Sequence, residues 1–95
     1  MQKVLVIGLD QMITQTIERL INGFENYEGV ACGSLDEMVD RLKADQYNIL
    51  LIGAGFDKAT EQELQHIAGK IQPQLKIIEH YGGGSGLLLE ELNRE

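Results

Sequence analysis

The chain has 95 residues, 43% of them hydrophobic, and a formal net charge of −7. This length and composition predict a single globular domain over residues 1–95. The negative charge repels phosphate backbones and anionic lipids, and no apolar run reaches the length of a membrane span, so neither nucleic acid nor a membrane is an expected partner. There is no signal-peptide core at the N-terminus, and the single cysteine, Cys32, has no internal disulfide partner, so we expect a cytoplasmic protein.

The first strand–helix unit lies near the N-terminus. Lys3–Ile7 is a run of β-branched residues and leucine, typical of a strand buried on both faces. Asp10 is the predicted N-cap of the following helix, and Gly23 is its predicted left-handed end. The apolar stripe of this helix is Ile13, Ile17, Leu20, Ile21 and Phe24.

The second unit pairs a weaker strand with a well-capped helix. Glu28–Cys32 is the strand, with Val30 and Cys32 on one face. Ser34 and Glu37 have the spacing of a capping box, in which each side chain accepts a hydrogen bond from a free amide at the helix start. The apolar stripe of this helix is Leu35, Met38, Val39 and Leu42.

The third unit contains the most hydrophobic strand, Tyr47–Ile52, which we predict to be central. Thr60 and Glu63 predict a second capping box, and Pro73 marks the end of the helix that follows. The apolar stripe of that helix is Leu64, Ile67, Ala68 and Ile71.

The fourth unit begins with the strand Leu75–His80, whose charged residues are typical of a sheet edge. Ser85 is the predicted cap of a last helix, which carries Leu87, Leu88, Leu89 and Leu92. The order is therefore (βα)4. Strictly alternating elements predict a parallel sheet with right-handed crossovers and helices on both faces.

These segments resemble parts of a response-regulator receiver domain. Ser34–Gly53 resembles its second helix and third strand, Lys3–Ile7 its first strand, and Gln72–Ile78 the lead into its fourth. The resemblance covers residues 3 to 81. It implies a three-layer, flavodoxin-like α/β sandwich with a four-stranded parallel sheet in the order 2-1-3-4.

The functional positions of a receiver fall on other residue types in this chain. The acidic pair that holds a divalent metal falls on Gly8 and Leu9, and only Asp10, one place later, is acidic. The phospho-accepting aspartate falls on Gly53, and the hydroxyl residue of the fourth strand on Tyr81. The lysine of a fifth strand has no counterpart. The resemblance therefore implies a non-catalytic pseudo-receiver with no metal and no cofactor.

A second resemblance is to IIB-type subunits of sugar phosphotransferase systems, in length, sheet and a glycine-rich segment before the last helix. Their mechanism needs a cysteine at the end of the first strand, where this chain has Ile7 and Gly8. Cys32 follows the second strand instead, and we interpret it as a small core residue. This resemblance implies a shape without the activity.

Two kinds of ligand site remain as hypotheses. The glycine-rich turn Gly82–Gly86 before a helix exposes backbone amides, and Gly82, Gly83, Gly84 and Ser85 suit an anion or nucleotide, as in a sensor. Alternatively, the turn simply positions the last helix. Asp10, Asp57 and His80 follow strands, and three side chains of these types can together bind a metal ion. A helix cap, a loop residue and a strand-end residue explain them equally well, and we predict no metal.

The last helix predicts a homodimer. Leu87, Leu88 and Leu89 cannot share one helical face, so part of this leucine surface needs a partner. Without a fifth strand, the fourth is an open sheet edge. The predicted dimer surface is Leu75, Ile77, Leu87, Leu88, Leu89 and Leu92. In the alternative interpretation, the last helix covers its own sheet.

Overall fold

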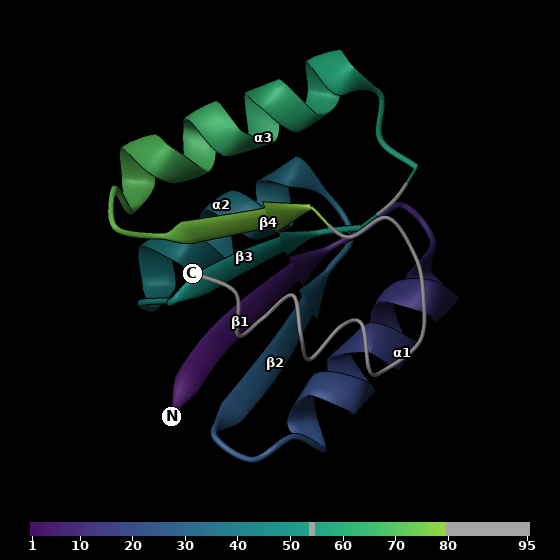
Figure 1. Ribbon diagram of the computed structural model, residues 1–95. Helices are drawn as coiled ribbons and strands as arrows, with labels where there is room; N and C mark the ends of the chain where they lie inside the picture. The colour runs from purple at the N-terminus through teal and green to yellow at the C-terminus, as the bar shows by residue number, and fades with distance from the viewer. Residues whose placement is uncertain (54, 80–95) are drawn as a thin grey trace.

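The computed structural model describes residues 1–53 and 55–79, which form a four-stranded parallel sheet and three helices (Figure 1). The sheet order is β2-β1-β3-β4, as predicted. The strands are β1 (Gln2–Ile7), β2 (Tyr27–Cys32), β3 (Ile49–Ile52) and β4 (Lys76–Glu79), and the helices are α1 (Gln11–Asn22), α2 (Leu35–Ala44) and α3 (Lys58–Ile71). The predicted last helix with its leucines, the glycine turn, His80 and Tyr81 lie outside the described residues.

The register of the sheet aligns the carboxyl ends of its strands. Ile7 pairs with Cys32 of β2 and with Ile52 of β3, and Ile52 pairs with Glu79 of β4. The carboxyl ends of the four strands therefore lie at one edge, which we call the carboxyl edge of the sheet. In open α/β sheets this edge is where ligands bind.

Alternation along the two inner strands divides the core into two layers. Leu5, Ile7, Leu50 and Ile52 pack with residues of α2 and α3 on one face. Val4, Val6, Ile49 and Leu51 pack with Ile17 and Ile21 of α1 on the other. Successive side chains point to opposite faces, and all four residues of β3 are buried. The predicted flavodoxin-like arrangement is confirmed, with α1 on one face and α2 and α3 on the other (Figure 1).

Two details predicted for α1 are wrong. Ile13 is 59% exposed, and Thr14 is buried in its place at 5% exposure. The cause is Gly8, because its missing side chain leaves space for Thr14 to face inward. Gly23 ends α1 in right-handed geometry with φ −84°. The left-handed residue in this connection is Asn26, with φ 70°.

The cap of α3 also differs from the prediction. Asp57, and not Thr60, is the N-cap, and its Oδ1 accepts a hydrogen bond from the Thr60 backbone N–H at 2.7 Å. Thr60 lies in the first turn. Asp57 and Thr60 have the same N-cap to N3 spacing as the predicted pair Thr60 and Glu63. An aspartate is at least as good an N-cap as a threonine. The predicted caps Asp10 and Ser34 are confirmed: Asp10 accepts from Ile13 N–H and Ser34 from Glu37 N–H.

The cap predicts a pH dependence of stability. Hydrogen bonds from Thr60 lower the pKa of Asp57 from its usual 3.8. The stabilisation by its charged form is therefore present above that value and is lost as the pH falls through the lower pKa of the folded state. We expect Asp57→Asn, which keeps a capping oxygen, to flatten this acidic limb of a thermal-melting curve against pH. An unchanged acidic limb would contradict this role.

The outer edge of β2 is bonded by side chains of α1. The Asn22 side chain accepts from the Gly29 N–H at 2.8 Å and donates to the Gly29 carbonyl at 3.2 Å. Glu18 accepts from the Ala31 N–H at 2.7 Å. Gly29 permits this close approach, because an added Cβ would lie 3.1 Å from the Glu18 carbonyl oxygen and from Ile21. Three of the backbone groups that another strand would need are thus already bonded.

Candidate functional site

The carboxyl edge of the sheet carries glycines where β1 and β3 end. Gly8 N–H donates to the Cys32 carbonyl at 3.4 Å, and Gly53 N–H donates to the Ile7 carbonyl at 2.8 Å. A Cβ added to Gly8 would lie 2.2 Å from Thr14 Oγ1. One added to Gly53 would lie 3.3 Å from the Ile7 carbonyl oxygen and 3.6 Å from Gly8 Cα. These two strand tips are therefore packed backbone with little room for a side chain.

Two acidic side chains at this edge, Asp10 and Asp57, have structural roles. Asp10 and Asp57 each cap a helix, and Thr14 Oγ1 also donates to the Asp10 carbonyl at 2.7 Å. Among residues 1–53 and 55–79 no group of three His, Cys, Asp or Glu side chains is placed to hold a metal ion. The structure thus places Asp10 and Asp57 as caps, and His80 lies outside the described part of the chain.

A hollow of about 410 Å³ lies at this edge where β1 and β2 end. Leu9, Gln11 and Gln15 contribute one side of its lining, and Glu37 of α2 contributes to another. The remaining lining residues are Gly8, Thr14, Ala31, Cys32 and Gly33. Its polar side chains are two neutral amides, the Thr14 hydroxyl and one carboxylate, with no basic group, so a side chain from a partner suits this hollow better than an anion does.

Cys32 adjoins the hollow but is not a nucleophile. It is 3% exposed, and burial raises the pKa of its thiol from 9.0 to about 12. The thiolate is the reactive form, so this environment makes the side chain inert. The interpretation of Cys32 as a core residue is confirmed, since it packs with Met38 and Ile7.

Labelling of Cys32 is expected to require unfolding. A rise in pKa from 9.0 to about 12 lowers the thiolate fraction at pH 8 roughly a thousandfold, and burial blocks access as well. Iodoacetamide at pH 8 should therefore modify the native protein far more slowly than the urea-unfolded protein, as measured by intact mass. Equal rates in the two states would contradict this placement.

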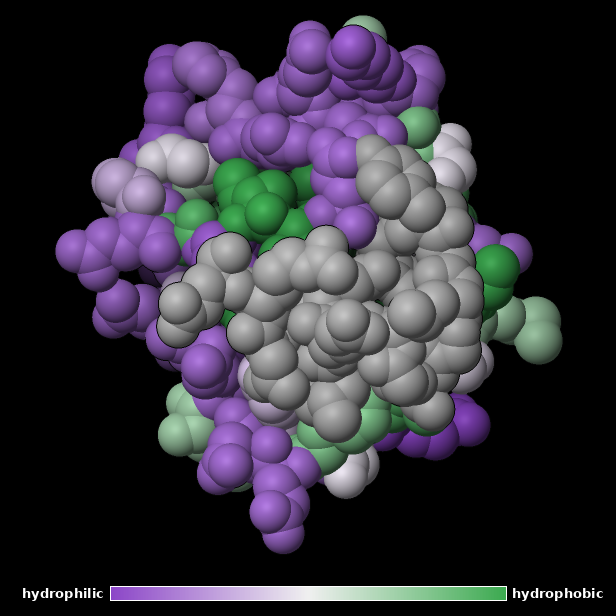
Figure 2. Space-filling view, in the orientation of Figure 1, coloured by the Kyte–Doolittle hydropathy of each residue, from purple (hydrophilic) through white to green (hydrophobic). Residues whose placement is uncertain are grey.

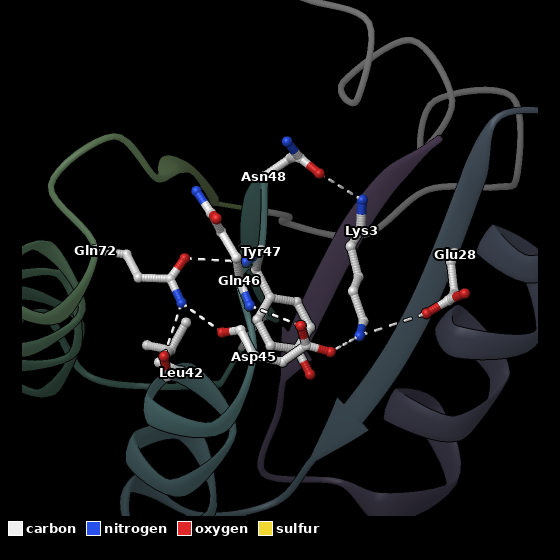
Figure 3. Close-up of polar contacts among 8 residues, drawn as sticks. All are labelled: Lys3, Glu28, Leu42, Asp45, Gln46, Tyr47, Asn48 and Gln72. Carbon is white, nitrogen blue, oxygen red and sulfur yellow. Dashed lines mark hydrogen bonds and ion pairs between the residues drawn. The ribbon is translucent and has the colours of Figure 1, made fainter.

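A polar network, which the sequence analysis did not predict, lies at the opposite, amino edge of the sheet (Figure 3). The Gln72 side chain accepts from the Tyr47 N–H at 3.0 Å and donates to the carbonyls of Leu42 at 2.8 Å and Asp45 at 2.7 Å. It therefore joins the end of α3 to the end of α2 and to the loop before β3. No motif marks such a glutamine, because its partners are backbone groups about 30 residues away.

Lys3 forms the second half of this network. Its Nζ is bonded to the Asp45 carboxylate, lies 3.7 Å from a Glu28 oxygen and is 5.1 Å from the centre of the Tyr47 ring. The hydrogen bond between the Lys3 ammonium and the Asp45 carboxylate raises the pKa of Lys3 and lowers the pKa of Asp45. Glu28 and Asp45 are solvent-exposed, whereas the Tyr47 ring is buried, and the contacts hold the loops of this edge in place. We therefore assign the amino edge a structural role.

The predicted dimer residues that the structure describes lie at the β4 edge. Leu75 is 9% exposed and belongs to the core, and Ile77 is half-buried against the same core. Leu87, Leu88, Leu89 and Leu92 are outside the described residues, as are Gly82, Gly83, Gly84 and Ser85. The anion site stays a prediction, which a thermal-shift screen with nucleotides, sugar phosphates and sulfate tests. No helix that the structure describes is long and apolar enough to cross a membrane.

Comparison with solved structures shows what this fold is similar to. One similar structure is a candidate pilus assembly-related protein from Burkholderia pseudomallei, at TM-score 0.68 and 21% identity over 97% of this chain and 71% of that one. Another is a candidate pilus assembly protein, CpaE, from Burkholderia thailandensis, at TM-score 0.65 and 23% identity over 97% of this chain and 78% of that one. No protein-family model and no curated protein matches the sequence. The comparison establishes a receiver-like α/β fold.

Proposed function

We propose that this chain is a pseudo-receiver, a receiver-like domain that transfers no phosphate and acts by binding proteins, as a homodimer. The observation that supports this best is steric. At the positions that match the carboxylates of a receiver, Gly8 is packed under Thr14 and Gly53 against the Ile7 carbonyl. Asp10, the nearest acid, caps α1. A metal-assisted phosphoryl transfer needs free carboxylates at this edge.

The structural neighbours suggest a setting for such a module. Both similar structures are described as related to pilus assembly. A protein-binding domain without chemistry of its own fits a role within a multi-protein assembly. We therefore propose that the partners of this chain belong to pilus assembly machinery or to a comparable multi-protein assembly.

Phosphorylation chemistry tests the first part of the proposal. The purified protein is incubated with acetyl phosphate and Mg²⁺, and its intact mass is measured beside a receiver domain that retains its aspartate. We expect no phosphoryl adduct on this chain and a clear adduct on the control. Mg²⁺ with beryllofluoride should leave its amide NMR spectrum unchanged. An adduct on the chain would overturn the pseudo-receiver proposal.

We propose β4 as the dimer edge. The outer edge of β2 is occupied by Asn22 and Glu18, whereas β4 is the other outer strand of the described sheet. A two-fold axis perpendicular to the sheet would place two β4 strands side by side and antiparallel. Side chains on one face of the first strand would then lie beside side chains on the same face of the second. With Ile77 opposite its own copy, its half-buried side chain would be covered by the partner.

Light scattering tests the dimer. Ile77→Lys places a charge on the edge strand and is expected to yield monomer, as is Leu88→Glu in the predicted last helix. Ala44→Lys adds the same charge as Ile77→Lys at an exposed position of α2 and should leave the mass unchanged. Circular dichroism confirms that each variant is folded. A wild-type monomer at high micromolar concentration would rule the dimer out.

A further inference from the structure

An exposed apolar surface lies at the start of α1. Leu9 is 62% exposed, Met12 79% and Ile13 59%, and we call these three residues the α1 patch. Leu9 also reaches the loop after β3, since a Cβ on Gly55 would lie 3.6 Å from Leu9 Cδ1. In Figure 2, green atoms protrude at the right edge, where Figure 1 places the start of α1. Clustered exposed apolar side chains on a small protein mark an interaction site.

The patch has features that suit a protein partner. Residues 11–17 of α1 carry no charge, although 24% of the chain is charged. The hollow of about 410 Å³ begins at Leu9, so a partner side chain has a place to insert beside the patch. On the outer side of β2, the N–H groups of Gly29 and Ala31 are already bonded by Asn22 and Glu18. A partner backbone must therefore satisfy its own hydrogen bonds, as a helix does.

The negative charge around the patch favours a positively charged partner. Helix starts and strand ends at the carboxyl edge carry mainly acids, namely Asp10, Asp36, Glu37, Asp57, Glu61 and Glu79, beside Lys58. The bases gather at the amino edge instead, where helices end and strands begin: Lys3, Arg19, Arg41, Lys43, Lys70 and Lys76. This division follows the helix dipoles, and it also leaves the patch in a field that attracts cations.

We propose that the α1 patch binds an amphipathic helix whose apolar face is flanked by lysine or arginine. The apolar face covers Leu9, Met12 and Ile13, one side chain enters the hollow, and the basic flanks face Asp10 and Glu37. The site is separate from the proposed dimer edge, because β2 and β4 lie at opposite ends of the sheet. A failure of either proposal therefore leaves the other intact.

Two synthetic amphipathic helices of equal length test the proposal, one of leucine and lysine and one of leucine and glutamate. Each is labelled with a fluorophore and titrated with the protein at two salt concentrations. We expect the lysine helix to bind with an affinity that falls with salt, and the glutamate helix not to bind. Amide shifts in 9–16 and around the hollow should identify the site.

Variants separate the patch from the general charge of the protein. Met12→Ser combined with Ile13→Ser leaves the charge unchanged, and we expect about tenfold weaker binding of the lysine helix. Gln62→Ser combined with His66→Ser, at exposed positions of α3, should have no effect. Equal affinity of the patch variant and wild type would overturn the proposal, as would absence of binding to the wild type. Equal binding of the glutamate helix would overturn the charge selection.

Discussion

Gly8→Ala is expected to lower the free energy of unfolding by about 2 kcal/mol, a typical cost for overpacking. The new Cβ would lie 2.2 Å from Thr14 Oγ1, inside van der Waals contact. Thr14 cannot simply turn away, because its χ1 is restricted in a helix and its hydroxyl donates to the Asp10 carbonyl. Either this bond breaks or α1 moves off the tip of β1. Urea unfolding followed by circular dichroism measures the loss.

A second substitution shows whether Thr14 is the cause. In Gly8→Ala combined with Thr14→Ala, the clashing oxygen is absent and the remaining contact is that to Thr14 Cβ at 3.4 Å. The double variant should therefore be more stable than the sum of the single effects by about 1 kcal/mol. Thr14→Ala alone serves as the control for the lost hydroxyl. Strict additivity would show that the loss in Gly8→Ala has another origin.

Gln72→Ala is expected to destabilise the fold by about 2 kcal/mol, since it removes three hydrogen bonds and leaves their backbone partners without this side chain. The partners are the Tyr47 N–H and the carbonyls of Leu42 and Asp45, which belong to two connections at the amino edge. Gln72→Glu keeps the acceptor for the Tyr47 N–H but sets a carboxylate oxygen against the two carbonyls, so we expect it to be no more stable than Gln72→Ala.

The matched control lies two residues further on. Gln74 is an exposed glutamine of the same loop, so Gln74→Ala removes a side chain of the same kind without these bonds. We expect its midpoint of urea unfolding to match wild type. If Gln72→Ala lowers the free energy of unfolding no more than Gln74→Ala does, the three hydrogen bonds of Gln72 do not stabilise the fold.

The fold could be predicted from the sequence because its signals are local and strong. Residues 4–7 of β1 and all of β3 are continuous apolar runs, Ser34 and Asp10 are caps with their partners three residues on, and the elements alternate strictly. The errors arose at helix ends, where packing or the choice between two possible caps decides. Ile13 fits the helical stripe, yet the missing side chain of Gly8 turns Thr14 inward instead.

The candidate sites were less predictable for the same physical reason. Gly8 and Gly53 were recognised as the positions where receiver carboxylates are missing, but only the structure shows that backbone and Thr14 fill the space. The exposure of Leu9 and Met12 depends on where the first turn of α1 lies relative to the sheet, which periodicity does not report. The Gln72 network joins backbone groups far apart along the chain.

The side chains that bond the outer edge of β2 also have a consequence for hydrogen exchange. Amides on the outer side of an edge strand usually exchange quickly, whereas the Gly29 and Ala31 N–H groups are held by Asn22 and Glu18 of α1. They should exchange only when α1 detaches, so α1 and β2 open as one cooperative unit. Asn22→Ala would then free the Gly29 amide to exchange while β1 and β3 stay protected. The β2 edge of the sheet is thereby coupled to the helix that presents the α1 patch.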